Sequence, residues 1–144
     1  YNFAILIGGL HHVHQDVDLA INNICNSIKE GGYIINFEPT FELKVIEKIR
    51  AVIYKKNNFF DENTEKDFNL NELNKKFEKN NLKLVMNVRV GYFAYIFFYN
   101  PDAFPIISFL PKVFVKFFFF IDKIISNIKY LNKCFFATIS LYRK

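Results

Sequence analysis

The chain has 144 residues, a hydrophobic content of 51% and a formal net charge of +5. This composition excludes an intrinsically disordered chain, and the length suffices for one domain with a sizeable core. The lysines are spread along the chain, so we predict no nucleic-acid partner, whereas the 19 phenylalanines and the basic charge suit contact with a membrane surface.

Residues 3–7 form a continuous apolar run that ends in a glycine-containing turn. A continuous run, rather than an alternating one, is typical of a strand whose two faces are both covered. Gly8 and Gly9 follow, and glycine lets the backbone turn sharply or approach a ligand closely because it has no Cβ. Ligands of open α/β sheets bind just beyond the carboxyl ends of such strands, so we expect a functional site in this turn.

The next residues predict a helix followed by a second strand. Asp16 is the expected N-cap of the helix, whose apolar stripe is Val17, Ile21, Ile24, Cys25 and Ile28. Gly31 and Gly32 are expected to end it through left-handed backbone angles, and residues 33–37 form the second apolar strand. Two strands joined in this way predict a parallel pair with a right-handed crossover.

The middle of the chain predicts a further helix and a polar loop. Pro39 is a good first residue for this helix, with Arg50 on its outer side and an inner face of Val45, Ile46, Ile49, Val52 and Ile53. Residues 57–69 are polar and predict a surface loop, in which Phe59 and Phe60 suit a lid.

Asn69 or Asn71 is expected to cap a short helix, and residues 82–90 alternate as in a half-covered strand. Residues 112–128 predict a helix with an apolar stripe, and Phe119 lies on its other side. Prolines and lysines interrupt the aromatic region, whereas a membrane-spanning helix needs about 20 mostly apolar residues, so we predict no span. A substrate lid, an interfacial helix and an ordinary aromatic core all remain open for this region.

The two cysteines and the start of the chain bear on its setting. Cys25 and Cys134 lack metal-binding or redox spacing, and both are expected to be buried thiols of a cytosolic protein. No signal peptide is recognisable. The chain opens two residues before a strand and without Met, so we expect its beginning to be missing.

The three histidines of the turn do not predict a metal site. In an extended segment neighbouring side chains point to opposite sides, so His11 and His12 are not expected to share an ion, whereas His12 and His14 could. No Cys, Asp or Glu beside them completes a recognisable ligand set.

Several short segments resemble class I S-adenosylmethionine-dependent methyltransferases, in particular their small-molecule, type 11-like group. The run from Phe3 to Leu10-His11-His12-Val13 resembles the family's fourth strand and the turn after it. The segment Ile28-Lys29-Glu30-Gly31-Gly32 and the strand after it are similar to the family's fifth strand with its preceding helix end, and residues 136–144 are similar to its antiparallel last strand. Only the second half of the family's domain is represented.

The resemblance implies an α/β fold, namely the C-terminal half of a Rossmann-like methyltransferase sheet with an antiparallel last strand. Residues 1–144 would be a partial domain with its core at 1–90 and 134–144, and residues 91–131 would be an aromatic helical lid or interfacial insertion. The family's glycine-rich cofactor loop and its acidic ribose-binding residue lie upstream of this half. This chain should therefore bind S-adenosylmethionine weakly or not at all and be inactive by itself.

The resemblance also assigns roles to the turn. The residues that would border the cofactor are Gly8, Gly9, Leu10 and His11. Glu38 would touch the substrate or cap the helix that follows it. His12 and His14 are candidate catalytic bases because imidazole titrates near neutral pH, and each is otherwise an ordinary turn histidine that caps a helix or bonds to backbone.

The expected reaction is methyl transfer from S-adenosylmethionine to a small or lipid-like acceptor in the cytoplasm, with peripheral membrane contact left open. The alternative is a non-catalytic membrane-surface or partner-binding module of the same fold. The acceptor atom and the oligomeric state are not indicated.

Overall fold

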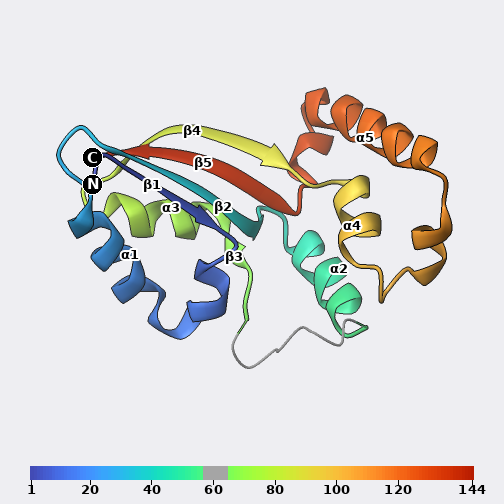
Figure 1. Cartoon of the computed structure of the whole chain (residues 1–144), viewed down its shortest axis with the longest axis horizontal. Coiled ribbons are helices and arrows are strands. Elements are labelled where there is room, and N and C mark those ends of the chain that lie inside the picture. The colour runs from blue at the N-terminus through green and yellow to red at the C-terminus, as the bar shows by residue number, and fades with distance from the viewer. Residues whose placement is uncertain (57–64) are drawn as a thin grey trace. The chain divides into compact units, whose positions relative to one another are not determined.

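The computed structural model describes residues 1–56 and 65–144, which fall into two compact units (Figure 1). Unit 1 consists of Tyr1–Thr40, Asp61–Val88 and Ala137–Lys144, and unit 2 of Phe41–Phe60 and Arg89–Phe136. The described residues 41–56 cluster with the aromatic region. Phe59 and Phe60, the predicted lid residues, lie outside the described residues.

Unit 1 is built on a mixed sheet. Its strands lie in the order β1 (Phe3–Ile7), β2 (Tyr33–Phe41), β5 (Ala137–Arg143) and β4 (Lys83–Val90), and the short β3 (Phe68–Asn69) pairs with β2. β1 runs parallel to β2, whereas β5 runs antiparallel to it. Both the parallel pair and the antiparallel last strand are confirmed, and so is the α/β fold.

Two helices, α1 (Val17–Ser27) and α3 (Leu70–Glu78), cover one face of this sheet (Figure 1). Most of the stripe predicted for α1 is buried against it, together with apolar residues of α3; the core contains Val17, Ile21, Cys25, Ile28, Leu73 and Phe77. The side chain of Asn69 caps α3 by accepting hydrogen bonds from the backbone of Asn71 at 3.0 Å and Glu72 at 3.4 Å. Asp16 precedes α1 but makes no capping bond with its side chain.

The other face of the sheet is apolar and uncovered by any helix of unit 1 among the described residues (Figure 1). The register places its side chains in rows across β1, β2 and β5: Phe3–Tyr33–Arg143, Ile5–Ile35–Leu141 and Ile7–Phe37–Ile139. The exposed fractions reach 57% at Ile5 and 72% at Ile7. The prediction that β1 is covered on both faces is therefore wrong for this chain, because its described helices cover only one face.

Gly31 and Gly32 join α1 to β2 in two different ways. Gly31 has a φ of +76°, so the left-handed conformation expected there is confirmed. Gly32 does not have a positive φ. A Cβ on Gly32 would instead lie 2.6 Å from Ile28 Cγ2 and 2.9 Å from the carbonyl oxygen of Asn2, so this position needs glycine for close packing.

The prediction of a helix beginning at Pro39 is wrong. β2 continues to Phe41 because β5 pairs with it, with Ala137 opposite Pro39, and the hydroxyls of Thr40 and Thr138 are 2.9 Å apart. Pro39 lies beyond the last residue that β2 pairs with β1. The helix, α2 (Lys44–Tyr54), begins five residues later.

Unit 2 contains α2 and the aromatic region. Its other elements are α4 (Phe93–Tyr99), η2 (Pro105–Phe109), α5 (Lys112–Asn127) and η3 (Leu131–Lys133). Ile46 of α2 is buried with Phe41 and Phe136. Arg50, expected on the outer side of α2, is also buried: its guanidinium donates to the carbonyl of Phe136 and lies 5.3 Å from the centre of that ring.

Helix α5 is apolar but has no buried residue. Three of its phenylalanines are mostly exposed, and they include Phe119 at 61%, which the sequence placed away from the apolar stripe. Within the described part of the chain, no helix combines the length and apolarity that crossing a bilayer requires.

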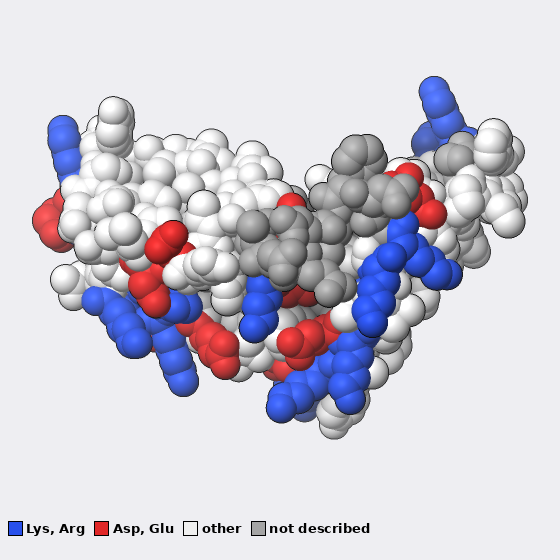
Figure 2. All heavy atoms as spheres, turned by 90° about the horizontal axis from the view of Figure 1, so that it is seen from below, with Lys and Arg blue, Asp and Glu red and all other residues white. Residues whose placement is uncertain are grey.

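The charged side chains on the face drawn in Figure 2 belong to both signs, and lysines and arginines lie among aspartates and glutamates. In unit 2, Glu42 pairs with Arg89 at 2.9 Å and with Lys133 at 3.0 Å. Burial by itself would raise the pKa of Glu42, but the hydrogen bonds from Lys133 and Arg89 outweigh it and hold that pKa below its usual value.

Candidate functional site

The turn after β1 is a short 3₁₀ helix, η1 (Leu10–Asp16), and it lies at the carboxyl ends of the two parallel strands. Gly8 leads into it with a φ of +58°, a conformation that favours glycine, and its backbone N–H donates to the carbonyl of Phe37 at 2.8 Å. The chain therefore leaves β1 while still hydrogen-bonded to β2.

A buried carboxylate holds this turn in place. Glu38, at the end of β2, has a fully buried side chain and accepts hydrogen bonds from the backbone of Gly9 at 2.9 Å and Leu10 at 2.8 Å through Oε1. Its Oε2 accepts from the backbone of His11 at 3.4 Å and lies 2.8 Å from Nδ1 of the same residue. Glu38 thus caps η1, not the helix that follows β2.

This arrangement limits what the four predicted cofactor residues can offer. The backbone N–H groups of Gly8, Gly9, Leu10 and His11 are all engaged, with Phe37 or with Glu38. The Leu10 side chain is buried in the core of unit 1, whereas a Cβ on Gly9 would meet no atom within 4 Å. Gly9 and the edge of His11 are what this turn presents to a ligand.

His11 and His12 lie together, with ring centres 4.1 Å apart. The expectation that they point to opposite sides is wrong, because it assumed an extended segment and residues 10–12 lie in a 3₁₀ helix. His12 is exposed, and its Nδ1 lies 3.1 Å from Oε1 of Glu65. Glu65 was not anticipated, because it is 53 positions from His12 and no local pattern marks it.

His14 contacts other residues than His11 and His12 do. Its ring stacks on Phe68 of β3, with centres 5.5 Å apart. Partial burial, with a smaller contribution from the positive charges of Lys66 and Lys76, lowers the pKa of His14 below its usual value. This shift favours the neutral imidazole, the form that a base needs; the catalytic roles of His12 and His14 stay predictions.

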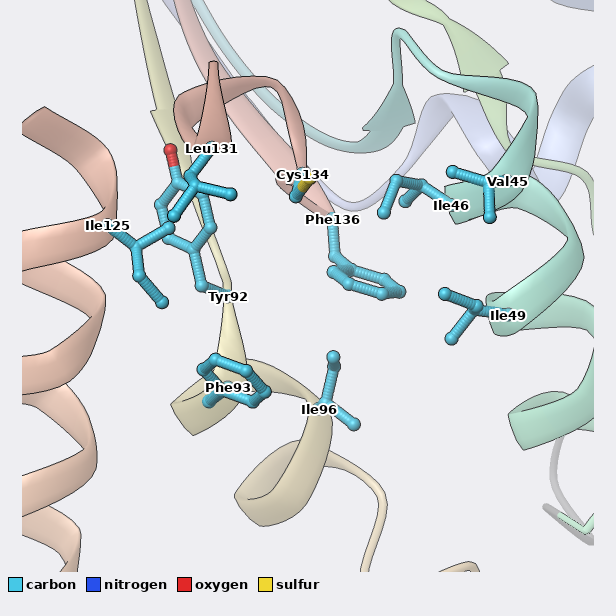
Figure 3. A pocket seen from close by; sticks show the side chains of 10 residues that line it. All are labelled: Val45, Ile46, Ile49, Tyr92, Phe93, Ile96, Ile125, Leu131, Cys134 and Phe136. Atoms are coloured by element: carbon cyan, nitrogen blue, oxygen red, sulfur yellow. The ribbon is translucent and has the colours of Figure 1, made fainter. Parts of the chain in front are cut away.

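Unit 2 contains an apolar cavity of about 450 Å³, within the range of small-molecule sites. Figure 3 shows the side chains that line it, which come from α2, α4, α5 and the segment around η3: Val45, Ile46, Ile49, Tyr92, Phe93, Ile96, Ile125, Leu131, Cys134 and Phe136. Cys134, expected to be a buried thiol, is partly exposed on this wall. Cys25 is buried as expected.

Asp122 joins two walls of the cavity. From α5 its carboxylate accepts hydrogen bonds from the backbone of Phe93 at 2.8 Å, and of Tyr92 and Ala94 at 3.2–3.3 Å, at the start of α4. Burial raises the pKa of Asp122, and these three backbone donors act against that shift. Sequence reasoning missed this tie because Asp122 is about thirty positions from its partners.

No protein-family model and no curated protein matches the sequence. Solved structures do match the fold. An O-methyltransferase from a Brevibacillus brevis trans-AT PKS multienzyme, in complex with S-adenosyl-L-homocysteine, is 16% identical with a TM-score of 0.55, and the match covers 99% of this chain and 44% of that one.

Two further structures match over the same span. The cyclase SpnF is 15% identical with a TM-score of 0.53, and the match covers 100% of this chain and 49% of SpnF. A complex of the Haloferax volcanii Trm112 methyltransferase activator with a methyltransferase matches at 10% identity and a TM-score of 0.54, covering 99% of this chain and 53% of that one. The chain thus has a Rossmann-like methyltransferase fold and spans about half the length of these structures.

Proposed function

We propose that this chain is the C-terminal part of an S-adenosylmethionine-dependent methyltransferase. The observation that carries the proposal is the sheet: two parallel strands, an antiparallel last strand beside them, and a match to methyltransferase structures over 99% of the chain. A fold alone does not fix a reaction, and SpnF, a cyclase, shares this one. The assignment therefore needs a direct test.

The cofactor would lie against the turn after β1. Bound S-adenosylmethionine would supply the methyl group, and Gly9 and His11 would form one wall of its site. Because the backbone donors of residues 8–11 are already engaged, this wall supplies shape and not hydrogen bonds. Most of the polar recognition of the cofactor must come from residues outside this chain, which agrees with the expected weak binding.

We place the methyl acceptor in the cavity of unit 2. Every side chain that lines it is apolar or aromatic except the thiol of Cys134, so a small hydrophobic or lipid-like molecule is the class that fits. A charged acceptor would lose its hydration there without gaining a partner from the side chains that line the cavity.

The uncovered face of the sheet supports the view that further polypeptide completes the domain. Rows of mostly apolar side chains on β1, β2 and β5 lie on this face, and β1 pairs with only one strand among the described residues. Parallel sheets are covered on both faces and unpaired edges attract other strands, so the missing cover would be helices and a strand beside β1.

The experiment is a calorimetric titration of S-adenosylmethionine into two proteins: the 144-residue chain, and the same chain extended by the residues encoded upstream of Tyr1. We expect heat of binding from the extended protein and little or none from the 144 residues. Binding to neither protein would overturn the methyltransferase assignment. Equal binding to both would overturn the view that the recognition of the cofactor lies outside this chain.

The second candidate is a membrane-surface module of the same fold without catalysis. Its support is α5, in which exposed phenylalanines accompany Lys112, Lys116 and Lys123. Binding of the extended protein to anionic vesicles without any binding of S-adenosylmethionine would favour this candidate. Binding of the cofactor would favour the enzyme.

A further inference from the structure

The structure assigns a second site to the turn after β1: we propose that His11, His12 and Glu65 bind a divalent transition-metal ion of the zinc class. One ligand atom from each of the three residues lies within 4.8 Å of the other two. The cluster belongs entirely to unit 1 and is distinct from the apolar cavity of unit 2.

His11 is already oriented as a ligand. Nδ1 of His11 lies 2.8 Å from Oε2 of Glu38, which already accepts from the backbone of His11, so we assign the imidazole hydrogen to Nδ1 with Glu38 as its acceptor. The lone pair is then on Nε2. A buried carboxylate that holds a histidine in this way is the usual outer shell of a metal-binding histidine.

His12 and Glu65 complete the set from the exposed side. Their contact atoms, Nδ1 and Oε1, are 3.1 Å apart, close to the separation of about 3.3 Å that a tetrahedral zinc ion with bonds of about 2.0–2.1 Å imposes on its ligands. Glu65 is mostly buried, with 16% of its side chain exposed, and it lies beside an imidazole and not in bulk water. A bound cation would satisfy both groups together.

The chemical types of the three ligand atoms indicate which metal ions the site would prefer. Two imidazole nitrogens and one carboxylate oxygen suit zinc, cobalt or nickel better than magnesium or calcium, which prefer oxygen ligands alone. Three protein ligands leave the fourth tetrahedral position for water or for a ligand oxygen.

The test is a titration of the full 144-residue chain with Zn²⁺ by calorimetry and with Co²⁺ by visible absorption, without S-adenosylmethionine. We expect one site, with tetrahedral cobalt absorption. His12→Gln and Glu65→Gln each remove a ligand and should weaken binding more than 100-fold. Glu38→Gln removes only the acceptor for His11 Nδ1 and should weaken it about 10- to 100-fold.

His14→Gln is the matched control, because His14 lies in the same helical turn but outside the cluster, and it should leave the affinity unchanged. Circular dichroism checks that each variant is folded, and His12 is exposed, so its replacement should not disturb the fold. Absence of a site in the parent chain, or equal affinity in all variants, overturns the proposal. Because the readout is metal binding alone, neither result bears on the methyltransferase assignment.

Discussion

At the scale of single residues, the two cysteines offer a direct probe of the apolar cavity. Burial raises the pKa of the Cys25 thiol to about 11, so about one thiol in a thousand is ionised at pH 8. Cys134 is partly exposed on the cavity wall. Iodoacetamide at pH 8 should therefore modify Cys134 much faster than Cys25, as measured by mass spectrometry of tryptic peptides.

A long-chain alcohol or a similar uncharged apolar ligand should slow the modification of Cys134 several-fold. Cys25 is the internal control, and its slow rate should not change with the ligand. Modification of Cys134 that is unaffected by every apolar ligand tried would contradict the placement of the acceptor in this cavity.

The turn after β1 shows which residues of a functional site can be predicted from the neighbouring sequence. The glycines, the histidines and their position after a strand could all be predicted, because each is encoded within a dozen neighbouring residues. The partners could not. Glu38 reaches the turn from the next strand, and Glu65 is 53 positions from His12, so only the folded chain shows that one carboxylate caps the turn and the other faces His12.

At the scale of elements, the tie between α5 and α4 through Asp122 should stabilise unit 2. Asp122→Ala removes the acceptor of three backbone N–H groups at the start of α4, and the expected loss is about 1–2 kcal/mol in the free energy of unfolding, as for other helix caps. Asp122→Asn keeps an acceptor oxygen and should cost only a few tenths. Urea denaturation followed by circular dichroism measures both.

The raised pKa of Asp122 makes its contribution to stability depend on pH. Because burial raises it above the usual value, the folded chain holds this proton more tightly, and the contribution of the group to stability falls as the pH rises through the raised pKa. Asp122→Asn should remove that part of the pH dependence. Equal stability of the alanine and asparagine variants would show that the hydrogen bonds to α4 contribute nothing.

The elements themselves were largely predictable, and the errors share one cause. Helix stripes and strand runs depend on neighbouring residues, and α1, α3 and β1 follow from them. The end of β2 depends on pairing with β5, about a hundred positions away, and this pairing extends the strand past Pro39. Arg50 is buried for a similar reason, since its partner Phe136 is 86 positions away.

At the scale of the whole molecule, the uncovered face of the sheet is unusual because its exposed side chains are mostly apolar. A continuous apolar run predicted that β1 is covered on both faces, and the residues of β1 still have that character. Only the covering elements are absent from the described chain. The apolar run of β1 thus suits a strand that is covered on both faces, whereas the described helices cover only one of them.

Ile5 and Leu6 are adjacent residues of β1, and their side chains point to opposite faces of the sheet. Ile5 lies in the uncovered face, whereas Leu6 packs against the core beneath α1. In the 144-residue chain Ile5→Lys should leave the fold intact and reduce self-association, because it places a charge in an exposed apolar patch. Leu6→Lys is the matched control and should unfold the same chain, since it buries a charge without a partner.

In the protein extended upstream of Tyr1 the outcome for Ile5→Lys should reverse. If added polypeptide covers this face, the lysine is buried there and should destabilise the protein by several kcal/mol. Sedimentation velocity reports self-association, and urea denaturation reports stability, for each variant in both lengths of chain. Tolerance of Ile5→Lys in the extended protein would mean that the face stays open to solvent, and its apolar rows would then need another partner.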